Sequence, residues 1–465
     1  MKRHFHTKPI VVCLALALFF SGFYPLGTKA FALSIEEERK LGNRFVTQIR
    51  NYFELVEDDF ANQFIMNLGE YLTRPLEIKH FPFRFYIIND NTLNAFAAPG
   101  GHIFIFSGLV EAMESLDELA GVICHELGHV SARHLSRRIE QSKKIGLATM
   151  AGILAGALIG GEVAQAMMAG SMAAGAQMQL HYSRNDERQA DQLGFDYMKP
   201  SGFDPSGLIK TLQTLQRSNW LGTERIPAYL MTHPTGPERM SNLEAMLSHF
   251  KPDPPTSETL RLKEDFSLFK VILRAKCRDP QEAEGLFRLD LERNRDSYLP
   301  YFGLGIVYKE KRDYAQAIQH FKKAMEMGPL SAPILSSLGE TYQLIGQDEE
   351  AISILEKAVA LDHQNRSLLF TLAISYQNIE SYDKAIALFE KLSYLKPVNN
   401  EVYYNLGVSY GRKNRLALAH YNFGLYFKKL GQSEKARFHF QKADGLSGNE
   451  PELRKKIQSA AKGLL

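Results

Sequence analysis

The sequence predicts a mainly α-helical protein in which an α+β domain with a small sheet is followed by an all-α repeat solenoid. Three observations predict this class. Apolar residues recur at helical spacing, an alternating segment at 103–106 indicates a strand, and a 34-residue period fills the C-terminal part. The 465 residues are 45% hydrophobic and 23% charged, so the chain can bury more than one core.

The N-terminal segment 1–32 has the three parts of a secretory signal peptide. It begins with basic residues, continues with an apolar run at 10–20, and ends with the small-residue sequence AFA at 30–32. The run is shorter than the about 20 residues that a membrane span needs, although an uncleaved anchor stays open as the alternative. We therefore expect an exported mature chain.

Cleavage would remove four positive side chains and no acidic ones, so the formal net charge would change from +3 to −1. No basic excess would remain to favour a nucleic-acid partner. We therefore expect no nucleic acid among the partners.

The segment 251–260, KPDPPTSETL, separates two halves of different periodicity. Its three prolines forbid a continuous helix, which predicts a linker after a domain at 33–250. Downstream, seven positions have the spacing of a tetratricopeptide repeat, namely Leu304, Gly305, Tyr308, Ala317, Phe321, Ala324 and Pro329. Most recur 34, 68 and 102 residues later. We predict a tetratricopeptide-repeat domain at 298–465, preceded by a degenerate helical repeat at 261–297.

The repeat register changes near the C-terminus. Gly424, Phe427, Ala436 and Phe440 occupy repeat positions only half a period after Gly407, so one helix is expected to serve two repeats. The concave face of such a solenoid commonly binds peptides or protein partners. A purely structural appendage is the alternative.

The segment 116–134, LDELAGVICHELGHVSARH, predicts a helix that carries two histidines four residues apart. Residues i and i+4 share one helix face, so His125 and His129 can reach a single ion, with Glu126 beside them. In this HExxH arrangement two imidazoles bind zinc and the glutamate deprotonates water. His134 follows five positions later and is expected to point away, as a surface or supporting histidine.

A catalytic zinc needs a third protein ligand, which the segment 182–198 offers. Glu187 and Asp191 lie four residues apart on another predicted helix, and the small Ala190 lets that helix pack closely on the first. Glu187 can complete the ligand set, while Asp191 accepts a hydrogen bond from a ligand histidine and fixes its tautomer. Taken alone, the two acids would more simply form a solvated face.

Two further segments are expected at this site. The segment 91–113 holds a tight Pro-Gly-Gly turn and a strand signal, so Asn94, Ala95 and Phe96 could hold an extended substrate at a sheet edge. An ordinary hairpin is the alternative. His233 precedes a proline and is therefore expected on a loop or turn.

Together these segments resemble one family of zinc metallopeptidases, the family that includes the prenyl-protein CAAX protease and the heat-shock membrane protease HtpX. The resemblance covers about residues 36–246 and rests on five blocks in order: NAFAAPGG, GLV, ELAGVICHELGHV, SRNDERQAD and THPTGPER. It implies a zincin-like α+β metallopeptidase domain. It also implies one zinc ion per chain, bound by His125, His129 and Glu187.

The resemblance further implies that Glu126 is the general base and that Asp191 has a supporting role, with His233 and Arg239 near the site. Zinc would polarise a peptide carbonyl, and Glu126 would pass a proton from water to the leaving amine. Two opposed roles stay open for His233. It could donate a hydrogen bond to the tetrahedral oxyanion, or it could bind zinc and close the site until substrate displaces it.

With its signal peptide and repeats, the whole chain is similar to the periplasmic proteases of Gram-negative bacteria that enhance β-barrel assembly. This implies a periplasmic zinc endopeptidase that cleaves misfolded or unassembled envelope proteins, with repeats that recruit substrates or the outer-membrane assembly machinery. The alternative is a periplasmic chaperone or scaffold with a latent protease site.

The segment 145–180 is rich in glycine, alanine and methionine. Its longest uncharged run barely reaches the length that a membrane span requires, unlike the spanning helices of membrane members of the family. We expect a mobile apolar lid or a membrane-facing hairpin, with a buried helix pair as the alternative.

Overall fold

The computed structural model describes residues 34–141, 182–220, 227–251, 253–395, 398–448 and 450–464. The predicted signal peptide at 1–32 and the predicted lid at 145–180 lie outside these ranges. Among the helices of the described ranges, none is both long and apolar enough to cross a membrane.

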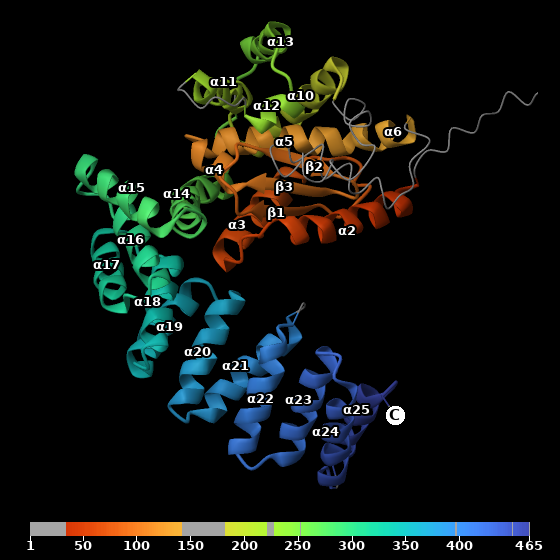
Figure 1. Cartoon of the computed structure of the whole chain (residues 1–465), viewed down its shortest axis with the longest axis vertical. Coiled ribbons are helices and arrows are strands. Elements are labelled where there is room, and N and C mark those ends of the chain that lie inside the picture. The colour runs from red at the N-terminus through yellow and green to blue at the C-terminus, as the bar shows by residue number, and fades with distance from the viewer. Residues whose placement is uncertain are drawn as a thin grey trace, which may run out of the picture.

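The N-terminal domain is a small sheet between helices (Figure 1). Its elements are α2 (Ile35–Tyr52), α3 (Asp59–Leu72), β1 (Arg84–Ile88), β2 (Ala95–Ala98), β3 (His102–Phe106), α4 (Ser107–Ala112), α5 (Leu116–Ser131), α6 (His134–Gln141), α10 (Arg184–Met198), η1 (Lys199–Ser201), α11 (Ser206–Trp220), α12 (Ala228–Thr232) and α13 (Pro237–Ser248). The helix and the strand that the sequence predicts around 116–134 and 103–106 are α5 and β3.

The strand order is β1-β3-β2, which makes β2 an edge strand of the sheet. β1 runs parallel to β3, and β2 runs antiparallel to it. The turn between β2 and β3 is the predicted one, with φ of 79° at Gly100 and 84° at Gly101. Glycine adopts this left-handed conformation without the strain that a Cβ would cause.

Alternation along the strands gives the sheet two different faces. On one face, the ring of Phe45 from α2 lies 5.9 Å from those of Phe96 and Phe104. On the other face, Phe85 and Ile103 belong to the apolar cluster that includes residues of α3 and α5. The helix with the HExxH motif therefore rests on the sheet through an apolar layer.

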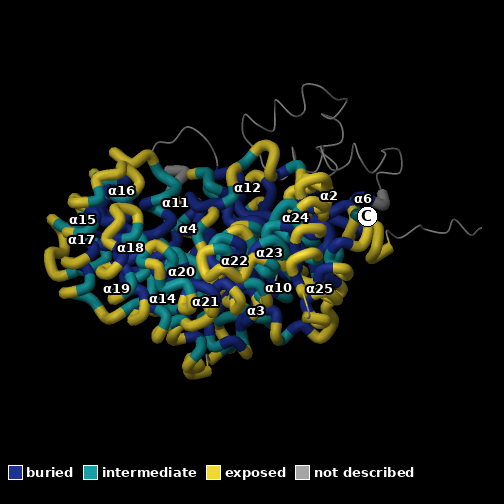
Figure 2. The backbone as a smooth tube through the Cα atoms, turned by 90° about the horizontal axis from the view of Figure 1, so that it is seen from below, coloured by how far each residue is buried: buried dark blue, intermediate teal, exposed yellow. Residues whose placement is uncertain are grey.

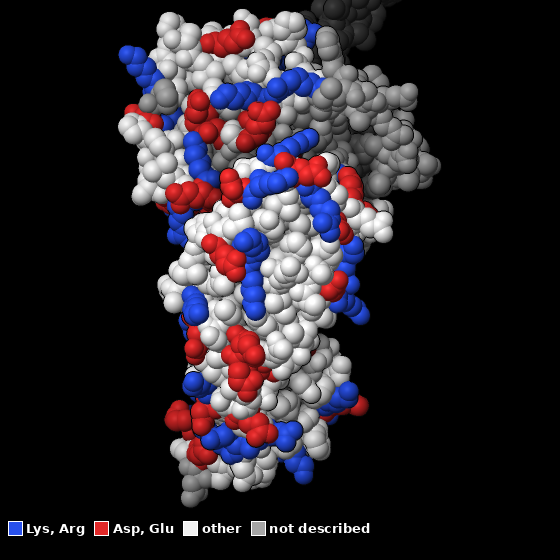
Figure 3. Space-filling model, turned by 90° about the vertical axis from the view of Figure 1, so that its left-hand side faces the viewer, with Lys and Arg blue, Asp and Glu red and all other residues white. Residues whose placement is uncertain are grey.

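The C-terminal part is a curved row of paired helices (Figure 1). They are α14 (Ser257–Cys277), α15 (Pro280–Arg293), α16 (Leu299–Glu310), α17 (Tyr314–Met327), α18 (Ala332–Leu344), α19 (Asp348–Leu361), α20 (Arg366–Asn378), α21 (Tyr382–Tyr394), α22 (Asn400–Arg412), α23 (Leu416–Lys429), α24 (Ser433–Leu446) and α25 (Pro451–Ala461). Figure 2 shows buried and exposed backbone alternating along these helices. On the face drawn in Figure 3, acidic and basic side chains are interspersed.

The glycines and aromatic residues at the repeat positions pack against each other, as the pattern predicts. A Cβ on Gly407 would lie 2.6 Å from the ring of Phe423, and one on Gly424 would lie 2.6 Å from the ring of Phe440. Helix α23 thus supplies an aromatic ring to the preceding helix and a close-packing glycine to the following one. This confirms the prediction that one helix serves two repeats.

Helix α14 joins the repeats to the N-terminal domain. It begins at Ser257, inside the segment 251–260 that we expected to be a linker. The rings of Phe269 on α14 and Phe64 on α3 stack at 4.4 Å, and Arg274 forms an ion pair of 2.7 Å with Glu111. The prolines end before α14 starts, so they do not prevent this helix from packing on the domain.

A second contact between the two parts involves α20. The backbone N–H of Ser367, in the first turn of α20, donates a hydrogen bond of 3.0 Å to the carboxylate of Asp59 at the start of α3. Asn365 caps the same helix end from within the repeats. A carboxylate at a helix N-terminus is favourable because it satisfies a free N–H and complements the helix dipole.

We predict that Asp59→Ala exposes the first turn of α20 to faster hydrogen exchange. The Ser367 amide loses an exposed acceptor that contributes about 1 kcal/mol, which corresponds to exchange about fivefold faster. Mass spectrometry of the peptide that covers this turn measures the change. Asp59→Asn keeps an acceptor oxygen and serves as the control, whereas equal exchange in wild type and Asp59→Ala would contradict the contact.

Candidate metal centre

Helix α5 carries the HExxH motif into the interior. The Ser115 side chain accepts a hydrogen bond from the Glu118 backbone N–H, which caps the first turn. About two and a half turns of helix then bring the motif to β2, where His125, Glu126 and His129 are all at most 1% exposed. Buried polar groups of this kind require partners, and the neighbouring helices supply them.

Helix α10 crosses α5 at very short distance. A Cβ on Gly128 of α5 would lie 2.7 Å from the carbonyl oxygen of Ala190, and one on Gly194 of α10 would lie 3.1 Å from the backbone nitrogen of His125. The prediction that Ala190 allows close packing is thereby confirmed. Because the backbones nearly touch, the side chain of Glu187 reaches both motif histidines, at 3.4 Å from each.

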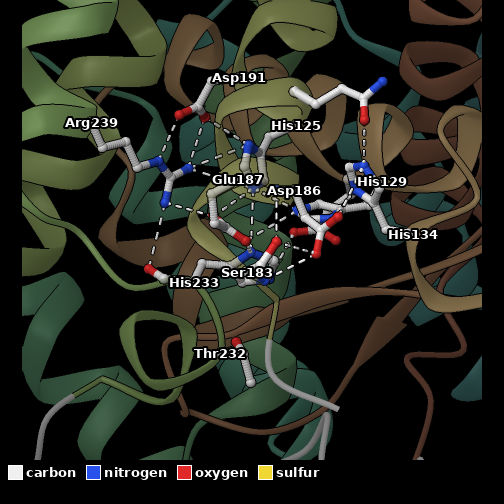
Figure 4. A network of polar contacts seen from close by, with 12 residues as sticks. His125, His129, His134, Ser183, Asp186, Glu187, Asp191, Thr232, His233 and Arg239 are labelled. Atoms are coloured by element: carbon white, nitrogen blue, oxygen red, sulfur yellow. Dashed lines mark hydrogen bonds and ion pairs between the residues drawn. The ribbon is translucent and has the colours of Figure 1, made fainter. Parts of the chain in front are cut away.

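Four side chains bring ligand atoms together at this crossing, as Figure 4 shows. They are His125, His129, Glu187 and His233, whose candidate ligand atoms all lie within 4.8 Å of one another. His125 Nε2 lies 3.0 Å from His129 Nε2 and 3.4 Å from Glu187 Oε2. Tetrahedral zinc with bonds of about 2.0–2.1 Å separates its ligands by about 3.3 Å. The donor set and its spacing therefore fit zinc.

His233 enters the cluster from the C-terminal end of the short helix α12. Its Nδ1 lies 3.3 Å from His125 Nε2 and 3.0 Å from Glu187 Oε1, while its Nε2 lies 3.5 Å from Glu126 Oε1. It is fully buried. The residue expected near the site thus stands in the position of a fourth ligand and also beside the expected base.

Asp191 of α10 and Arg239 of α13 contact the candidate ligands from outside the cluster. Asp191 Oδ1 lies 2.9 Å from Nδ1 of His125, which keeps the proton on Nδ1 and leaves the lone pair of Nε2 facing the cluster. Arg239 forms two hydrogen bonds with Asp191, of 2.7 Å and 2.8 Å, and its Nη1 lies 2.9 Å from Glu187 Oε2. Both residues lie where the sequence and the resemblance suggested.

Burial and neighbouring charges shift the pKa values of the cluster. Burial and Arg239 lower the pKa of His125, but hydrogen bonds with Asp191 and Glu187 outweigh them and raise it to about 9. Burial raises the pKa of Glu187, yet the three histidines bring it well below its usual range. Burial raises the pKa of Glu126. A carboxylate with a raised pKa is a stronger base than an exposed one, which suits proton transfer.

The position of His134 differs from the expectation that it points away. It is 1% exposed, and its Nδ1 lies 2.9 Å from Nδ1 of His129. Helix α5 ends at Ser131, and Arg133 has a left-handed φ of 52°. The helical angle from which we placed His134 therefore does not apply, because the chain turns back before this residue.

The three residues predicted to hold substrate lie on or beside the edge strand. Ala95 and Phe96 belong to β2, Asn94 directly precedes it, and all three are fully buried. The ring of Phe96 packs on the sheet face opposite α5, so its side chain points away from the ligands. The backbone N–H of Ala97, on the same strand, faces the Glu126 carboxylate. Any contribution of Phe96 to substrate binding would come from its backbone.

Sequence reasoning missed two tyrosines that surround the cluster. The ring of Tyr182 lies 3.8 Å from that of His129, and the ring of Tyr229 stacks on His233 at 4.6 Å. Both tyrosines are buried. Tyr182 is the first residue of the segment 182–198, and Tyr229 lies three residues before the block THPTGPER. Neither was predicted, because an isolated tyrosine forms no pattern that indicates such a role.

An HExxH helix on a small α+β domain, with a carboxylate third ligand from a crossing helix, defines the class of glutamate-ligand zincin-type sites. Comparison with known proteins agrees. Residues 61–247 match the model of peptidase family M48. Residues 301–364, 367–399 and 417–450 match tetratricopeptide-repeat models. The chain therefore contains a peptidase family M48 domain followed by tetratricopeptide repeats.

Individual relatives share parts of this arrangement. The chain is 30% identical over 319 residues to a beta-barrel assembly-enhancing protease of Yersinia pestis, which covers 67% of this chain and 62% of the relative. It is 31% identical over 251 residues to the protein of that name in Escherichia coli K12, which covers 53% and 50%. It thus spans between half and two thirds of their lengths. The structure of MamA aligns with 34% of this chain and 92% of its own at 25% identity, with a TM-score of 0.32.

We predict that Arg239→Met lowers the free energy of unfolding by about 3–5 kcal/mol, because two carboxylates lose a buried partner. Urea denaturation measures the loss. Arg188→Met is the matched control, since Arg188 pairs with Glu238 at the surface, where both side chains are more than half exposed. That control should cost at most about 1 kcal/mol. Similar losses for both variants would show that the buried network is not specially stabilising.

Proposed function

We propose that the chain is a zinc-dependent endopeptidase. The observation that carries this proposal is the ligand cluster of His125, His129, Glu187 and His233 with the buried carboxylate of Glu126 beside it. A purely structural zinc site would leave Glu126 without a purpose. The peptidase family M48 match over 61–247 supports the same reading.

Zinc, when bound, supplies Lewis-acid polarisation of the scissile carbonyl and of water. Glu126 accepts a proton from the attacking water and delivers it to the leaving amine. Asp191 keeps the Nε2 lone pair of His125 directed at the ion. The edge strand β2 lies beside α5, where the backbone of its Ala97 faces Glu126. An extended substrate can therefore pair with the backbone of β2 and present a peptide bond to Glu126.

The proposed substrates are misfolded or unassembled envelope proteins, and the proposed compartment is the periplasm. Support comes from the signal-peptide pattern at 1–32 and from relatives named beta-barrel assembly-enhancing proteases. The repeats would recruit these substrates or the outer-membrane assembly machinery through their concave face. The apolar segment 145–180 would contact the membrane peripherally.

We further propose that His233 keeps the site latent. Its Nδ1 lies as close to His125 and Glu187 as the other ligand atoms do, so it can take the zinc position that a substrate needs. Peptide hydrolysis then requires that His233 leave the ion. The opposed role, donation of a hydrogen bond to the oxyanion, remains the alternative.

We predict that Glu126→Gln abolishes cleavage of unfolded casein while zinc content stays at one ion per chain. Loss of a general base lowers the rate by about 10²–10⁴-fold. The substitution leaves the zinc ligands in place, because Glu126 is not one of the four candidate ligands. Cleavage is followed by the release of labelled peptides, and bound metal is measured in both proteins. Undiminished cleavage by Glu126→Gln would exclude this residue as the base.

His233→Ala separates the two roles of this histidine. If it is a displaceable fourth ligand, the variant should cleave casein faster than wild type. An oxyanion donor would instead give a rate about 10²–10³-fold lower. An unchanged rate would exclude both roles.

A second candidate function is that of a chaperone or scaffold whose protease site is rarely used. A cavity of about 370 Å³ between the repeats and the N-terminal domain favours a binding role. It is lined by Ser336 and Ser337 of α18 and by Asp58, the N-cap residue of α3, among others. In cells that lack the protein, Glu126→Gln should then restore function, whereas Ser336→Arg, which fills the cavity, should not. The reverse result would favour the protease.

A further inference from the structure

The outer side of His129 carries a chain of hydrogen bonds that the proposed chemistry has not used. Nδ1 of His129 lies 2.9 Å from Nδ1 of His134, and Nε2 of His134 lies 3.0 Å from Oε1 of Gln189. The carboxylate of Asp186 lies 3.7 Å from the same Nε2. Figure 4 shows His134 beside His129, at the right of the view.

The backbone places His134 there by a sharp turn. Arg133 has a φ of 52°, in the left-handed region that a residue other than glycine rarely adopts. Its guanidinium forms an ion pair of 2.8 Å with Glu38, a buried residue of α2. This pair holds the turn, so α6 starts with His134 folded back onto His129.

The partners of His134 decide which of its nitrogens carries the proton. Asp186 acts only as an acceptor, because it receives hydrogen bonds from Arg138 at 2.7 Å and from the backbone of Ser183 at 3.0 Å. With Asp186 and the Gln189 oxygen both near Nε2, the proton of His134 belongs on Nε2. Nδ1 of His134 is then an acceptor.

The proton between the two Nδ1 atoms must therefore come from His129. A neutral imidazole has one N–H and one lone pair, so a proton on Nδ1 leaves the lone pair on Nε2. That Nε2 lies 3.0 Å from Nε2 of His125 and 3.4 Å from Glu187 Oε1, inside the ligand cluster. The reverse tautomer would point an N–H at the ion and prevent coordination.

We propose that His134 is a positioning residue for zinc, which holds His129 in its metal-binding tautomer as Asp191 holds His125. Each motif histidine then has its own acceptor, a carboxylate for the first and an imidazole for the second. This inference rests on the proposed zinc site and concerns the affinity of the chain for the metal. His134 itself does not touch the ion or the substrate.

The test is the dissociation constant for zinc, measured on the purified full chain by competition with a chromophoric chelator. Loss of an acceptor behind a ligand histidine typically weakens metal binding by about 10–100-fold, and we expect this range for His134→Leu. His134→Asn should recover most of the affinity, because its Oδ1 can occupy the place of Nδ1 and accept the same proton. A role in packing alone would not distinguish the two variants in this way.

His102→Leu is the matched control. His102 is also a buried histidine, 2% exposed, whose Nδ1 lies 3.0 Å from the Tyr86 hydroxyl, but it is not among the candidate ligands. We expect it to lower stability and to leave the zinc constant unchanged. In the zinc-free wild type, long-range ¹H–¹⁵N spectra of labelled histidine should show the proton of His129 on Nδ1, a readout that requires no variant to fold.

The outcomes separate this inference from the function on which it rests. If the wild type binds zinc and His134→Leu binds it equally well, or if His129 carries its proton on Nε2, the inference is wrong and the metal centre stands. If His134→Leu, His134→Asn and His102→Leu all weaken zinc binding alike, His134 acts through general packing and the inference is again wrong. If the wild type binds no zinc, the metal centre fails and this inference fails with it.

Discussion

The close crossing of α5 and α10 is the constraint on which the rest of the site depends. Gly128 and Ala190 let the two backbones meet, and Gly194 lies against the backbone of His125. Glu187 reaches His125 and His129 across this crossing, at 3.4 Å from each, so a wider separation of the helices would move its carboxylate away from both. Ligand sets tolerate errors of only about 0.5 Å, which explains why the smallest residues stand at this crossing.

The second requirement is electrostatic. Three imidazoles and the carboxylates of Glu187, Asp191 and Glu126 lie together, each at most 3% exposed, with Arg239 as the neighbouring permanent cation. Without a metal, His125 carries a second proton besides the one on Nδ1, because its pKa is raised to about 9. A divalent cation can replace that proton and compensate the carboxylates, so metal binding and folding of this region should be coupled.

Local patterns in the sequence predicted most of the fold. The HExxH helix, the strand after the Pro-Gly-Gly turn and the repeats each follow from spacing along a short segment. The candidate ligands His125 and His129 could also be predicted, because residues i and i+4 share one face of a helix. Glu187 lies on another helix, and it was predicted from its spacing to Asp191 and from the family resemblance. Packing between repeats followed from the 34-residue period, since each pair of helices meets its neighbour in the same way.

The misses arose where the chain leaves a regular element or where partners are distant in sequence. His134 was misplaced because the helix ends at Ser131 and Arg133 reverses the chain. The packing of α14 on the N-terminal domain depends on contacts such as that between Phe64 and Phe269. These residues are far apart in the sequence, so no local pattern predicts their contact. Tyr182 and Tyr229 were missed for the same reason.

The most direct test of the four-residue metal centre is X-ray absorption at the zinc edge of the purified chain. We predict a first coordination shell of nitrogen and oxygen alone, at about 2.0–2.1 Å, with the multiple scattering of three imidazoles. Substitution of His233 by alanine should reduce the imidazole count to two. A shell with sulfur, or with two imidazoles already in the wild type, would contradict the four-residue site from which the proposed function is drawn.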